Sequence, residues 1–358
     1  MKFWKDNVKI RHLEVEEIFL ENSKGMCVSF LNYGGIITGI MVPDAGGTFD
    51  NIVLAYEDYE EYFDNPGYFG AIIGRTSGRI KDATFTINDT KYELGRNYGR
   101  HSGHGGHNGF HKKVFGYTIA ETDEEIEVRM TCSASHLEEG YPGNLEASII
   151  YSLSEDDVFT IRYEGRSTED TLINMTNHTY FNLSGSFEES IKYHELFIDA
   201  TYFAELDQSL VPTGQLIKVE NTPFDYRYMR EIGEEMDMSD PQIIIGRGYD
   251  HPFLLNKGDG TKARLAHRFS GRVMEITTDN DALVLYTQNY TQGQTIKGGV
   301  TLGERKAVAL EVQRPPIGHK ECFKENSIVR ADEHYKTFTR FRFFTENDSS
   351  SDSLMLLV

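Results

Sequence analysis

The chain has 358 residues and a formal net charge of −20, from 56 acidic residues against 36 lysines and arginines. Nucleic acids and anionic membranes attract basic proteins, so this balance argues against both as partners and disfavours a highly phosphorylated substrate. The length would allow two average domains, although all-β domains often exceed the average.

The first regular pattern along the chain is Glu57–Phe63, which fits one or two turns of helix. Two alternating segments follow, Thr84–Ile87 and Lys91–Leu94, and the turn between them contains Asn88 and Asp89, which predicts a β-hairpin. Later segments repeat the alternation and are rich in the residue types that fit a pleated, half-buried surface. These further predicted strands are Glu125–Cys132, Glu146–Leu153, Val158–Glu164, Arg272–Thr278, Ala282–Thr287, Ala307–Val312 and Thr337–Phe344.

Convincing amphipathic helices are scarce. Tyr228–Met238 is a second helical possibility, although its acidic stretch favours a solvated surface. Many short strands without alternating helices predict an all-β fold, either a sandwich or a barrel. Because no linker, repeat or shift in composition marks a boundary, we predict one domain over residues 1–345. Residues 346–358, rich in Ser and Asp and then apolar, are predicted to form a disordered tail.

The cysteines Cys27, Cys132 and Cys322 lie far apart, and no pair has CxxC spacing, which argues against a disulfide scaffold or a cysteine zinc site. The first residues lack the apolar segment of a secretory signal, and no run reaches the roughly 18 apolar residues of a membrane span. Asn-x-Ser/Thr triplets such as Asn177–Thr179 would invite glycans in a secreted eukaryotic protein. We therefore expect a cytoplasmic protein without a membrane partner.

Familiar motifs for nucleotide binding, zinc proteolysis and serine hydrolysis are absent from the sequence. The segment Arg100–His111 instead holds four of the twelve histidines among several glycines. Imidazole is a common metal ligand, but glycines prevent a helix from presenting histidines at fixed spacing. From the residues alone, the first interpretation of this segment is a solvated surface loop, the second a loop that approaches a ligand and the third a metal site.

The segment Asn174–Leu183 places polar groups in an apolar setting. If the alternation of a strand holds, Thr176, His178 and Tyr180 share one face. A histidine beside Asn and Thr suits an acid–base role, but a core histidine satisfied by its neighbours fits equally well. The residues leave both interpretations open.

Two carboxylates complete the set of candidates. Asp250 lies between Tyr249 and His251, and alone it would be read as a turn residue. Glu311 interrupts the apolar segment Val308–Gln313. Because a buried carboxylate is expensive unless it is paired or used, Glu311 is favoured as functional.

Together these motifs resemble the aldose 1-epimerase (galactose mutarotase) family, in the family's order and over about Asn32 to Phe344. No single motif is specific, but the ordered set is. The matching segments are Asn32–Gly35, Val42–Asp44, Asn51–Tyr56, Tyr68–Arg75, Gly78–Ile80, His104–Gly106 with Gly109–Phe110, Tyr141–Asn144, Thr176–His178, Pro212–Gly214, Thr222–Asp225, Gly248–His251 and Leu310–Gln313.

The resemblance implies a large antiparallel β-sandwich with a sugar-binding cleft, and it implies no metal and no other cofactor. It implies His178 as the proton donor and Glu311 as the proton acceptor. Arg79, His104 and Asp250 would hold the sugar. Asn177, beside His178, is included among the predicted sugar ligands, and the remaining histidines of the glycine-rich loop, His101, His107 and His111, would be bystanders.

Three positions depart from the family's pattern. Gly78 stands where the family has Asn, and Val284 stands where many members place a sugar-contacting Gln. After Gln313 the chain continues Arg314–Ile317 in place of the usual Pro-Asp. These departures concern which sugar the protein prefers.

The expected activity is interconversion of the α and β anomers of an aldohexose such as galactose or glucose, by acid–base opening and closure of the ring, in a monomer or homodimer. One alternative is a related epimerase for a disaccharide or a hexose 6-phosphate, for which Arg75, Arg100 and Arg314 could supply basic residues. Others are a glycosidase that pairs Asp250 with Glu311 and a non-catalytic sugar-binding protein.

Overall fold

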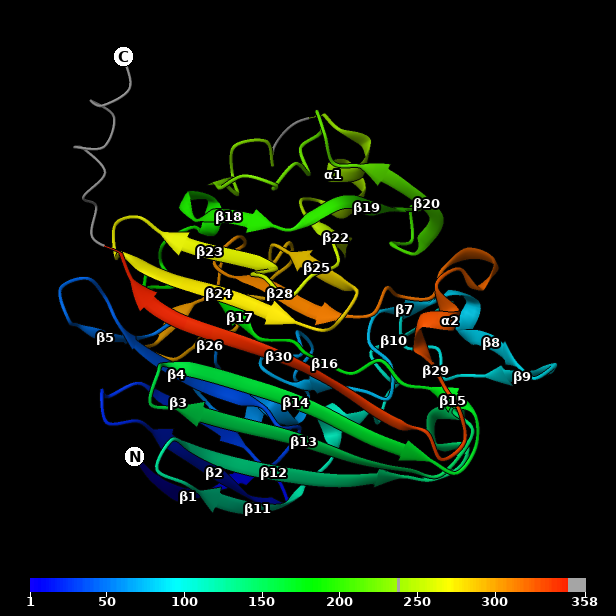
Figure 1. Ribbon diagram of the computed structural model, residues 1–358, viewed down its shortest axis with the longest axis horizontal. Helices are drawn as coiled ribbons and strands as arrows, with labels where there is room; N and C mark the ends of the chain where they lie inside the picture. Colours follow the sequence, from blue (N-terminus) through cyan, green and yellow to red (C-terminus); the bar gives the residue numbers. More distant parts are fainter. Residues whose placement is uncertain (237–238, 347–358) are drawn as a thin grey trace.

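The computed structural model describes residues 1–236 and 239–346. Its regular structure is almost entirely β, arranged in three large antiparallel sheets with several two-stranded pieces around them (Figure 1). Residues 347–358 of the predicted tail lie outside the described residues, as do residues 237–238 of the segment Tyr228–Met238. No helix in the described part of the chain has the length and apolarity of a membrane-spanning segment.

The first sheet is built from the start of the chain, and its strands pair in chain order. Its outermost strand, β1, carries mainly exposed side chains, whereas β3 and β4 are largely buried. The strands of this sheet are β1 (Lys2–Ile10), β2 (Leu13–Glu21), β3 (Cys27–Leu31), β4 (Ile37–Pro43) and β5 (Phe49–Asn51).

The second sheet has nine strands and crosses the front of the view in Figure 1. The last strand of the described chain, β30, pairs with β14 on one side and β24 on the other, so it joins strands from two distant parts of the sequence. In sheet order the strands are β11 (Gly116–Glu121), β12 (Glu125–Ala134), β13 (Leu145–Ser154), β14 (Val158–Ser167), β30 (His334–Thr345), β24 (Arg272–Thr278), β23 (Ala263–His267), β18 (Glu195–Ile198) and β21 (Arg230–Glu231).

The third sheet has six strands and positions the site described below. Its central strands, β28 and β25, are buried along nearly their whole length. In sheet order the strands are β17 (Tyr180–Phe181), β28 (Val308–Gln313), β25 (Ala282–Tyr286), β22 (Asp250–Leu255), β19 (Ala200–Leu206) and β20 (Pro212–Lys218).

Short elements connect the sheets. The paired short strands are β6 (Ile72–Ile73) with β16 (Thr176–Asn177), β7 (Arg79–Ile80) with β10 (Ser102–Gly103), β8 (Thr84–Ile87) with β9 (Thr90–Glu93), β15 (Thr171–Leu172) with β29 (Ile328–Val329), and β26 (Thr295–Ile296) with β27 (Val300–Thr301). The helices are α1 (Pro241–Gly246), α2 (Lys324–Ser327) and the 3₁₀ turns η1 (Tyr59–Phe63), η2 (Lys81–Ala83), η3 (Phe110–Lys112), η4 (Glu138–Gly140), η5 (Ile191–Tyr193) and η6 (His319–Glu321).

The core lies between the sheets and takes alternate residues from most of their strands. On β28, Val308, Leu310 and Val312 belong to this core, together with residues such as Phe30 of the first sheet and Phe159 of the second. Each such side chain contributes about 1.5–3 kcal/mol when it is fully buried. The residues between them on β28 must therefore point to the opposite face of the sheet, away from the core.

Every strand predicted from alternation is present, with ends that differ by a few residues, and the predicted all-β sandwich is confirmed. The helical turn predicted in Glu57–Phe63 is the 3₁₀ turn η1. The helical possibility for Tyr228–Met238 is wrong over its described residues, which contain β21 and turns. Buried Ile232 and Met236 tie this segment to the core, so it is more than a solvated acidic surface.

Candidate active site

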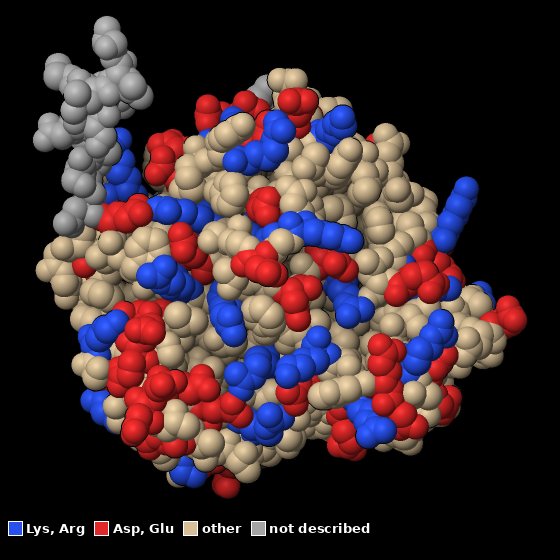
Figure 2. Space-filling model, in the orientation of Figure 1, with Lys and Arg blue, Asp and Glu red and all other residues tan. Residues whose placement is uncertain are grey.

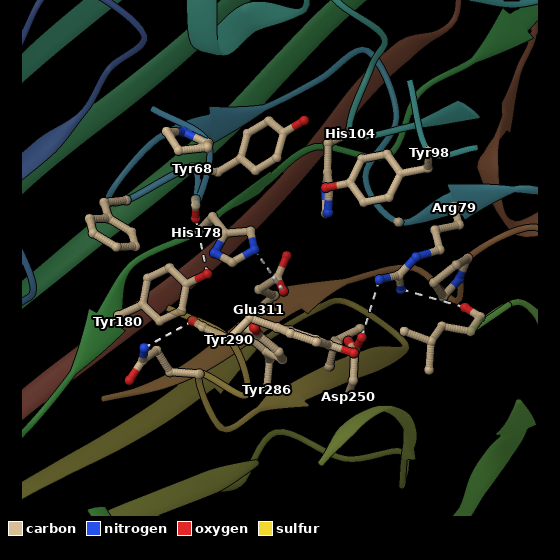
Figure 3. Close-up of a pocket in the computed structure, with 18 of the residues that line it drawn as sticks. Tyr68, Arg79, Tyr98, His104, His178, Tyr180, Asp250, Tyr286, Tyr290 and Glu311 are labelled. Carbon is tan, nitrogen blue, oxygen red and sulfur yellow. Dashed lines mark hydrogen bonds and ion pairs between the residues drawn. The ribbon is translucent and has the colours of Figure 1, made fainter. Parts of the chain in front are cut away.

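A cleft opens on the face of the six-stranded sheet that points away from the core, with a volume of about 270 Å³ (Figure 3). Its walls come from loops far apart in the sequence. Among the residues that line it are Tyr68, Gly78, Arg79, Tyr98, His104, His178, Tyr180, Leu210, Asp250, Pro252, Val284, Tyr286, Tyr290, Gln292, Glu311, Gln313 and Pro316.

The floor of the cleft follows from the register of three neighbouring strands. Pro252 of β22 pairs with Val284 of β25, and Val284 pairs with Glu311 of β28. Residues two positions along a strand lie on the same face, so Asp250 and Tyr286 extend the same floor. A valine thus occupies the centre of this floor, with Glu311 on one side and Pro252 on the other.

His178 lies where the chain passes from one sheet to another. Thr176 and Asn177 pair with β6, and the next strand, β17, pairs with β28 so that Tyr180 is opposite Ala309. Continuing that register by two residues places His178 opposite Glu311. The backbone N–H of His178 donates to the carbonyl of Ala71 at 2.9 Å, which fixes the turn between the two strands.

The expected single strand through Thr176, His178 and Tyr180 is therefore wrong. His178 and Tyr180 line the cleft, but Thr176 is fully buried and its hydroxyl donates to the carbonyl of Val312 at 2.7 Å. The alternation fails because the segment contributes to two different sheets.

The two predicted acid–base groups meet at the cleft floor. The Nε2 atom of His178 lies 3.4 Å from Oε1 of Glu311, and the side chains are 6% and 5% exposed (Figure 3). The other polar atoms, Nδ1 of His178 and Oε2 of Glu311, are buried and have no hydrogen-bond partner among the described residues. Buried polar atoms without a partner are costly, so their presence beside the cleft indicates a functional site.

Burial sets the protonation of this pair. It raises the pKa of Glu311 to about 8, with the negative charge of Asp250 acting in the same direction and Arg79 opposing it. Burial lowers the pKa of His178 to about 4, and Arg79 adds to this effect. Between these values the pair holds one proton that its two members can share. Such opposed shifts in a cleft are typical of functional acid–base groups.

Arg79 and Asp250 form a second polar group in the cleft. An Arg79 guanidinium nitrogen lies 3.2 Å from Oδ2 of Asp250, and a second nitrogen donates to the carbonyl of Leu210 at 3.5 Å (Figure 3). The guanidinium also lies over the ring of Tyr98, 5.3 Å from its centre. Burial raises the pKa of Asp250, and the guanidinium opposes that rise. The pair presents one donor and one acceptor to the cleft.

His104 reaches the cleft because the loop that carries it packs tightly against the chain. A side chain at Gly105 would place its first carbon 1.9 Å from the carbonyl oxygen of Gly74, so only glycine fits there. The ring of His104 lies 5.5 Å from that of His178, edge to face. Burial keeps the pKa of His104 well below its usual range, so the ring is neutral.

The other three histidines of this loop do not line the cleft. His101 Nδ1 accepts from the backbone N–H of Asp82 at 2.9 Å, while His111 is buried against the edge of Tyr68. His107 is exposed. Within residues 1–236 and 239–346, no group of three or more His, Cys, Asp or Glu side chains is placed to hold a metal ion.

Comparison with known proteins identifies the family of the chain. The sequence model of the aldose 1-epimerase family matches residues 16–342. This chain belongs to the aldose 1-epimerase family. It is 33% identical to a galactose mutarotase of Bos taurus over 332 residues, which cover 91% of this chain and 94% of the relative. It is 32% identical to an aldose 1-epimerase of Haemophilus influenzae over 333 residues, covering 91% of this chain and 95% of the relative.

The fold agrees with a solved member of the aldose 1-epimerase family. A crystal structure described as galactose 1-epimerase from Lactobacillus acidophilus NCFM superimposes with a TM-score of 0.85 and 28% sequence identity. The match covers 97% of this chain and 99% of that chain. The family resemblance found from the motifs is thus confirmed.

One of the predicted sugar ligands does not reach the cleft. The side-chain nitrogen of Asn177 donates to the carbonyl of Gly70 at 2.8 Å, and its oxygen accepts from the backbone N–H of Thr179 at 3.0 Å. Asn177 is absent from the cleft lining because it points to the opposite side of the chain from His178. It holds the turn that positions His178, and we do not retain it as a sugar ligand.

All three departures from the aldose 1-epimerase pattern reach the cleft, since Gly78, Val284 and Pro316 of Arg314–Ile317 line it, and the structure gives Gly78 a steric reason. A side chain at Gly78 would come within 2.6 Å of the ring of Pro316, and the backbone φ of +71° there also favours glycine. Pro316 fills the place that a side chain at position 78 would take. This wall of the cleft is therefore apolar.

Sequence reasoning missed the tyrosines of the cleft and gave no role to Gln313. Gln313 lies two residues after Glu311 on β28, so alternation already placed its amide on the same face. Tyr68, Tyr98 and Tyr286 come from three separate segments, and no local pattern connects them. Aromatic faces of this kind are common in the walls of ligand pockets.

Proposed function

We propose that this chain is an aldose 1-epimerase that interconverts the α and β anomers of an aldose by opening and closing its ring. The observation that carries the proposal is the buried contact between His178 and Glu311 on the cleft floor. The names of the relatives, galactose mutarotase and aldose 1-epimerase, support the same reaction class.

In the proposed reaction Glu311 accepts the proton of the C1 hydroxyl while His178 donates a proton to the ring oxygen. The bond between C1 and the ring oxygen breaks, and the C1 oxygen becomes an aldehyde. Rotation about the C1–C2 bond presents the other face of the aldehyde. Closure reverses the two proton transfers, so the enzyme and its proton count are restored without a cofactor or leaving group. General acid–base catalysis of this kind contributes about 10²–10⁴-fold for each group.

The remaining polar groups of the cleft are proposed to hold the sugar. Arg79 donates and Asp250 accepts, and the ring of His104, which lines the cleft, gives another polar contact. Their places around the floor support binding of several hydroxyls at once. A positioned substrate brings its C1 hydroxyl and ring oxygen to the acid–base pair.

The pH dependence follows from the shared proton. We expect kcat/KM to fall as pH rises through about 8, because the pair then loses the proton that His178 must donate. We expect a second fall as pH drops toward 4, where both groups are protonated and no base remains. Anomer exchange measured by NMR from pH 3.5 to pH 9.5, with the spontaneous rate subtracted at each pH, tests this. An alkaline limb centred near pH 6 would contradict it.

A hexose 6-phosphate is not supported as the substrate. Arg75 is buried and donates to the carbonyl of Pro142, and Arg100 pairs with Asp82 at the surface. Arg314 also lies outside the cleft lining. Among the described lining residues Arg79 is the single arginine, no lysine is present, and Arg79 already pairs with Asp250. This distribution favours a neutral sugar.

A glycosidase and a non-catalytic sugar-binding protein also fit the cleft residues less well. A glycosidase that paired Asp250 with Glu311 would leave the histidines of the cleft without a role, and Asp250 already pairs with Arg79. A non-catalytic sugar-binding protein would have no use for the buried contact of His178 with Glu311. A disaccharide with a free reducing end also fits an open cleft.

Polarimetry of freshly dissolved α-anomers of several sugars tests the proposed activity directly.

Gln313 is proposed as a further sugar ligand. Its amide nitrogen donates to the carbonyl of Arg314 at 3.2 Å, while its buried Oε1 has no partner among the described residues. Because a lost hydrogen bond costs about 0.5–1.5 kcal/mol or more, we expect Gln313→Leu to raise KM by roughly tenfold with little change in kcat. Steady-state kinetics check this, with Gln215→Leu, an exposed glutamine outside the cleft lining, as the control. An unchanged KM in Gln313→Leu would remove Gln313 from the site.

The cellular location and assembly are also proposals. A cytoplasmic location is supported by three cysteines that are all unpaired. On the face seen in Figure 2, acidic and basic side chains are interspersed and no large basic patch is present, in keeping with a small-molecule rather than a nucleic-acid partner. We retain the prediction of a monomer or homodimer, which sedimentation would decide.

A further inference from the structure

The centre of the cleft floor is apolar although its edges are polar. Val284 is 7% exposed and lies in register between Pro252 on β22 and Glu311 on β28. Tyr286, two residues along β25, lies on the same face. A valine side chain offers neither a donor nor an acceptor. Whatever part of the sugar lies over this position receives no hydrogen bond from Val284.

One oxygen of each carboxylate beside Val284 is already engaged. Oδ2 of Asp250 is held by Arg79 at 3.2 Å, and Oε1 of Glu311 lies toward His178 at 3.4 Å. Gln313 is two residues further along β28 than Glu311, at the wall formed by Pro316. None of these side chains supplies a hydrogen-bonding group over Val284 at the centre of the floor.

The proposed chemistry orients the sugar over this floor. C1 is bonded to three non-hydrogen atoms: the ring oxygen, the C1 hydroxyl oxygen and C2. In the reaction the ring oxygen faces His178 and the C1 hydroxyl oxygen faces Glu311. His178 precedes β17, which borders β28 on one side, whereas Val284 belongs to β25 on the other side. The third atom, C2, therefore points away from His178 and toward Val284.

We propose that the site does not recognise the C2 hydroxyl of its substrate, so that 2-deoxyaldoses are substrates as well as the parent aldoses; this rests on the proposed anomerase activity. A hydroxyl over Val284 gives up water without gaining a partner, and an aldose without it loses nothing. A site built to hydrogen-bond a hydroxyl rejects the deoxy analogue by about 10⁴–10⁵-fold, whereas an apolar contact discriminates only weakly.

The experiment compares kcat/KM for D-galactose and 2-deoxy-D-galactose, measured by NMR exchange between anomers with each sugar's spontaneous rate subtracted. For the wild-type protein we expect the two values to agree within about tenfold. Val284→Gln adds an amide beside Glu311, and we expect it to favour the parent sugar by at least a further tenfold. Val284→Ala, which changes volume without adding polarity, should keep the wild-type ratio.

The outcomes separate this inference from the proposed function. If the wild-type protein exchanges the anomers of neither D-galactose nor D-glucose, the proposed function itself fails. If D-galactose is exchanged but 2-deoxy-D-galactose is slower by 100-fold or more, only the placement of C2 over Val284 is overturned. An unchanged ratio in Val284→Gln would also overturn that placement. If Val284→Gln does not fold, Val284→Thr, which has nearly the shape of valine, takes its place.

Discussion

Replacing Glu311 with glutamine is expected to lower the rate of anomer exchange by about 10³-fold or more while sugar binding stays largely intact. Glutamine keeps the size of the side chain and can still hydrogen-bond the C1 hydroxyl, but it cannot accept the proton. Burial raises the pKa of Glu311 to about 8, so when the proton shared by the pair lies on His178, Glu311 is a stronger base than an ordinary carboxylate. The neutral amide of glutamine is far too weak a base to accept this proton.

The test of Glu311→Gln uses two measurements on the same purified variant. Calorimetry gives the sugar affinity, and NMR gives the rate of exchange between anomers. Glu17→Gln is the matched control, because Glu17 is a buried carboxylate, 3% exposed, that accepts from the hydroxyl of Tyr59 far from the cleft. This control should retain the activity of its folded fraction. Loss of exchange in both variants would point to general damage rather than loss of a base.

Two outcomes would contradict the assignment of Glu311. Exchange near the wild-type rate in Glu311→Gln would show that another group accepts the proton. Loss of binding together with exchange would show that Glu311 mainly holds the sugar, and Asp250, whose pKa is also raised by burial, would become the next candidate base. A protein that only binds sugars would show neither pattern, because it would have no turnover to lose.

The strands that carry the site could be predicted from the sequence because their alternation follows burial directly. On β28 the apolar Val308, Leu310 and Val312 face the core, and this leaves Glu311 on the opposite face. The same rule explains one of the missed strands, β1, although β2–β5, β11 and β18–β23 were not predicted either. β1 carries mainly exposed, often charged residues as the outermost strand of its sheet, so it has little apolar alternation to detect.

The meeting of the site residues could not be predicted from spacing. Arg79 and Asp250 are 171 positions apart, and only the closure of the whole fold brings them together. The resemblance to the family supplied their roles, not the periodicity. For Asn177, closeness in the sequence was misleading. Its place beside His178 in the chain suggested that both residues contact the sugar. A neighbour in an extended chain points to the other side, and its amide binds the backbone of Gly70.

His178 illustrates why local pattern and tertiary structure disagree at a functional position. The alternation of its segment predicts one strand, but the chain leaves β6 after Asn177 and joins β28 at Tyr180. The backbone bond of His178 to Ala71 comes from a segment more than a hundred residues earlier, which no local rule detects. The break allows the histidine ring to face the carboxylate of Glu311 instead of packing into a regular strand.

Replacing His178 with alanine is expected to preserve the fold and lower exchange by about 10²–10⁴-fold, mainly through kcat. The nearby ring of His104 is 5.5 Å from that of His178, and burial keeps its pKa well below the usual range, so it is a poor source of the missing proton. NMR exchange and circular dichroism on the same sample measure the loss of activity and the retention of structure. His107→Ala, in the same loop as His104 but exposed, is the control.

The size and form of the loss in His178→Ala decide its role. A lower kcat with nearly unchanged KM identifies a group that acts in the transition state, as a proton donor does. The acidic limb of the pH profile should move from about 4 to higher pH, because the residual activity then depends only on deprotonated Glu311, whose pKa lies at about 8. A rate within a few-fold of the wild type would remove His178 as the acid. The phenol of Tyr180, with its ring centre 4.8 Å from that of His178, would then be the group to test.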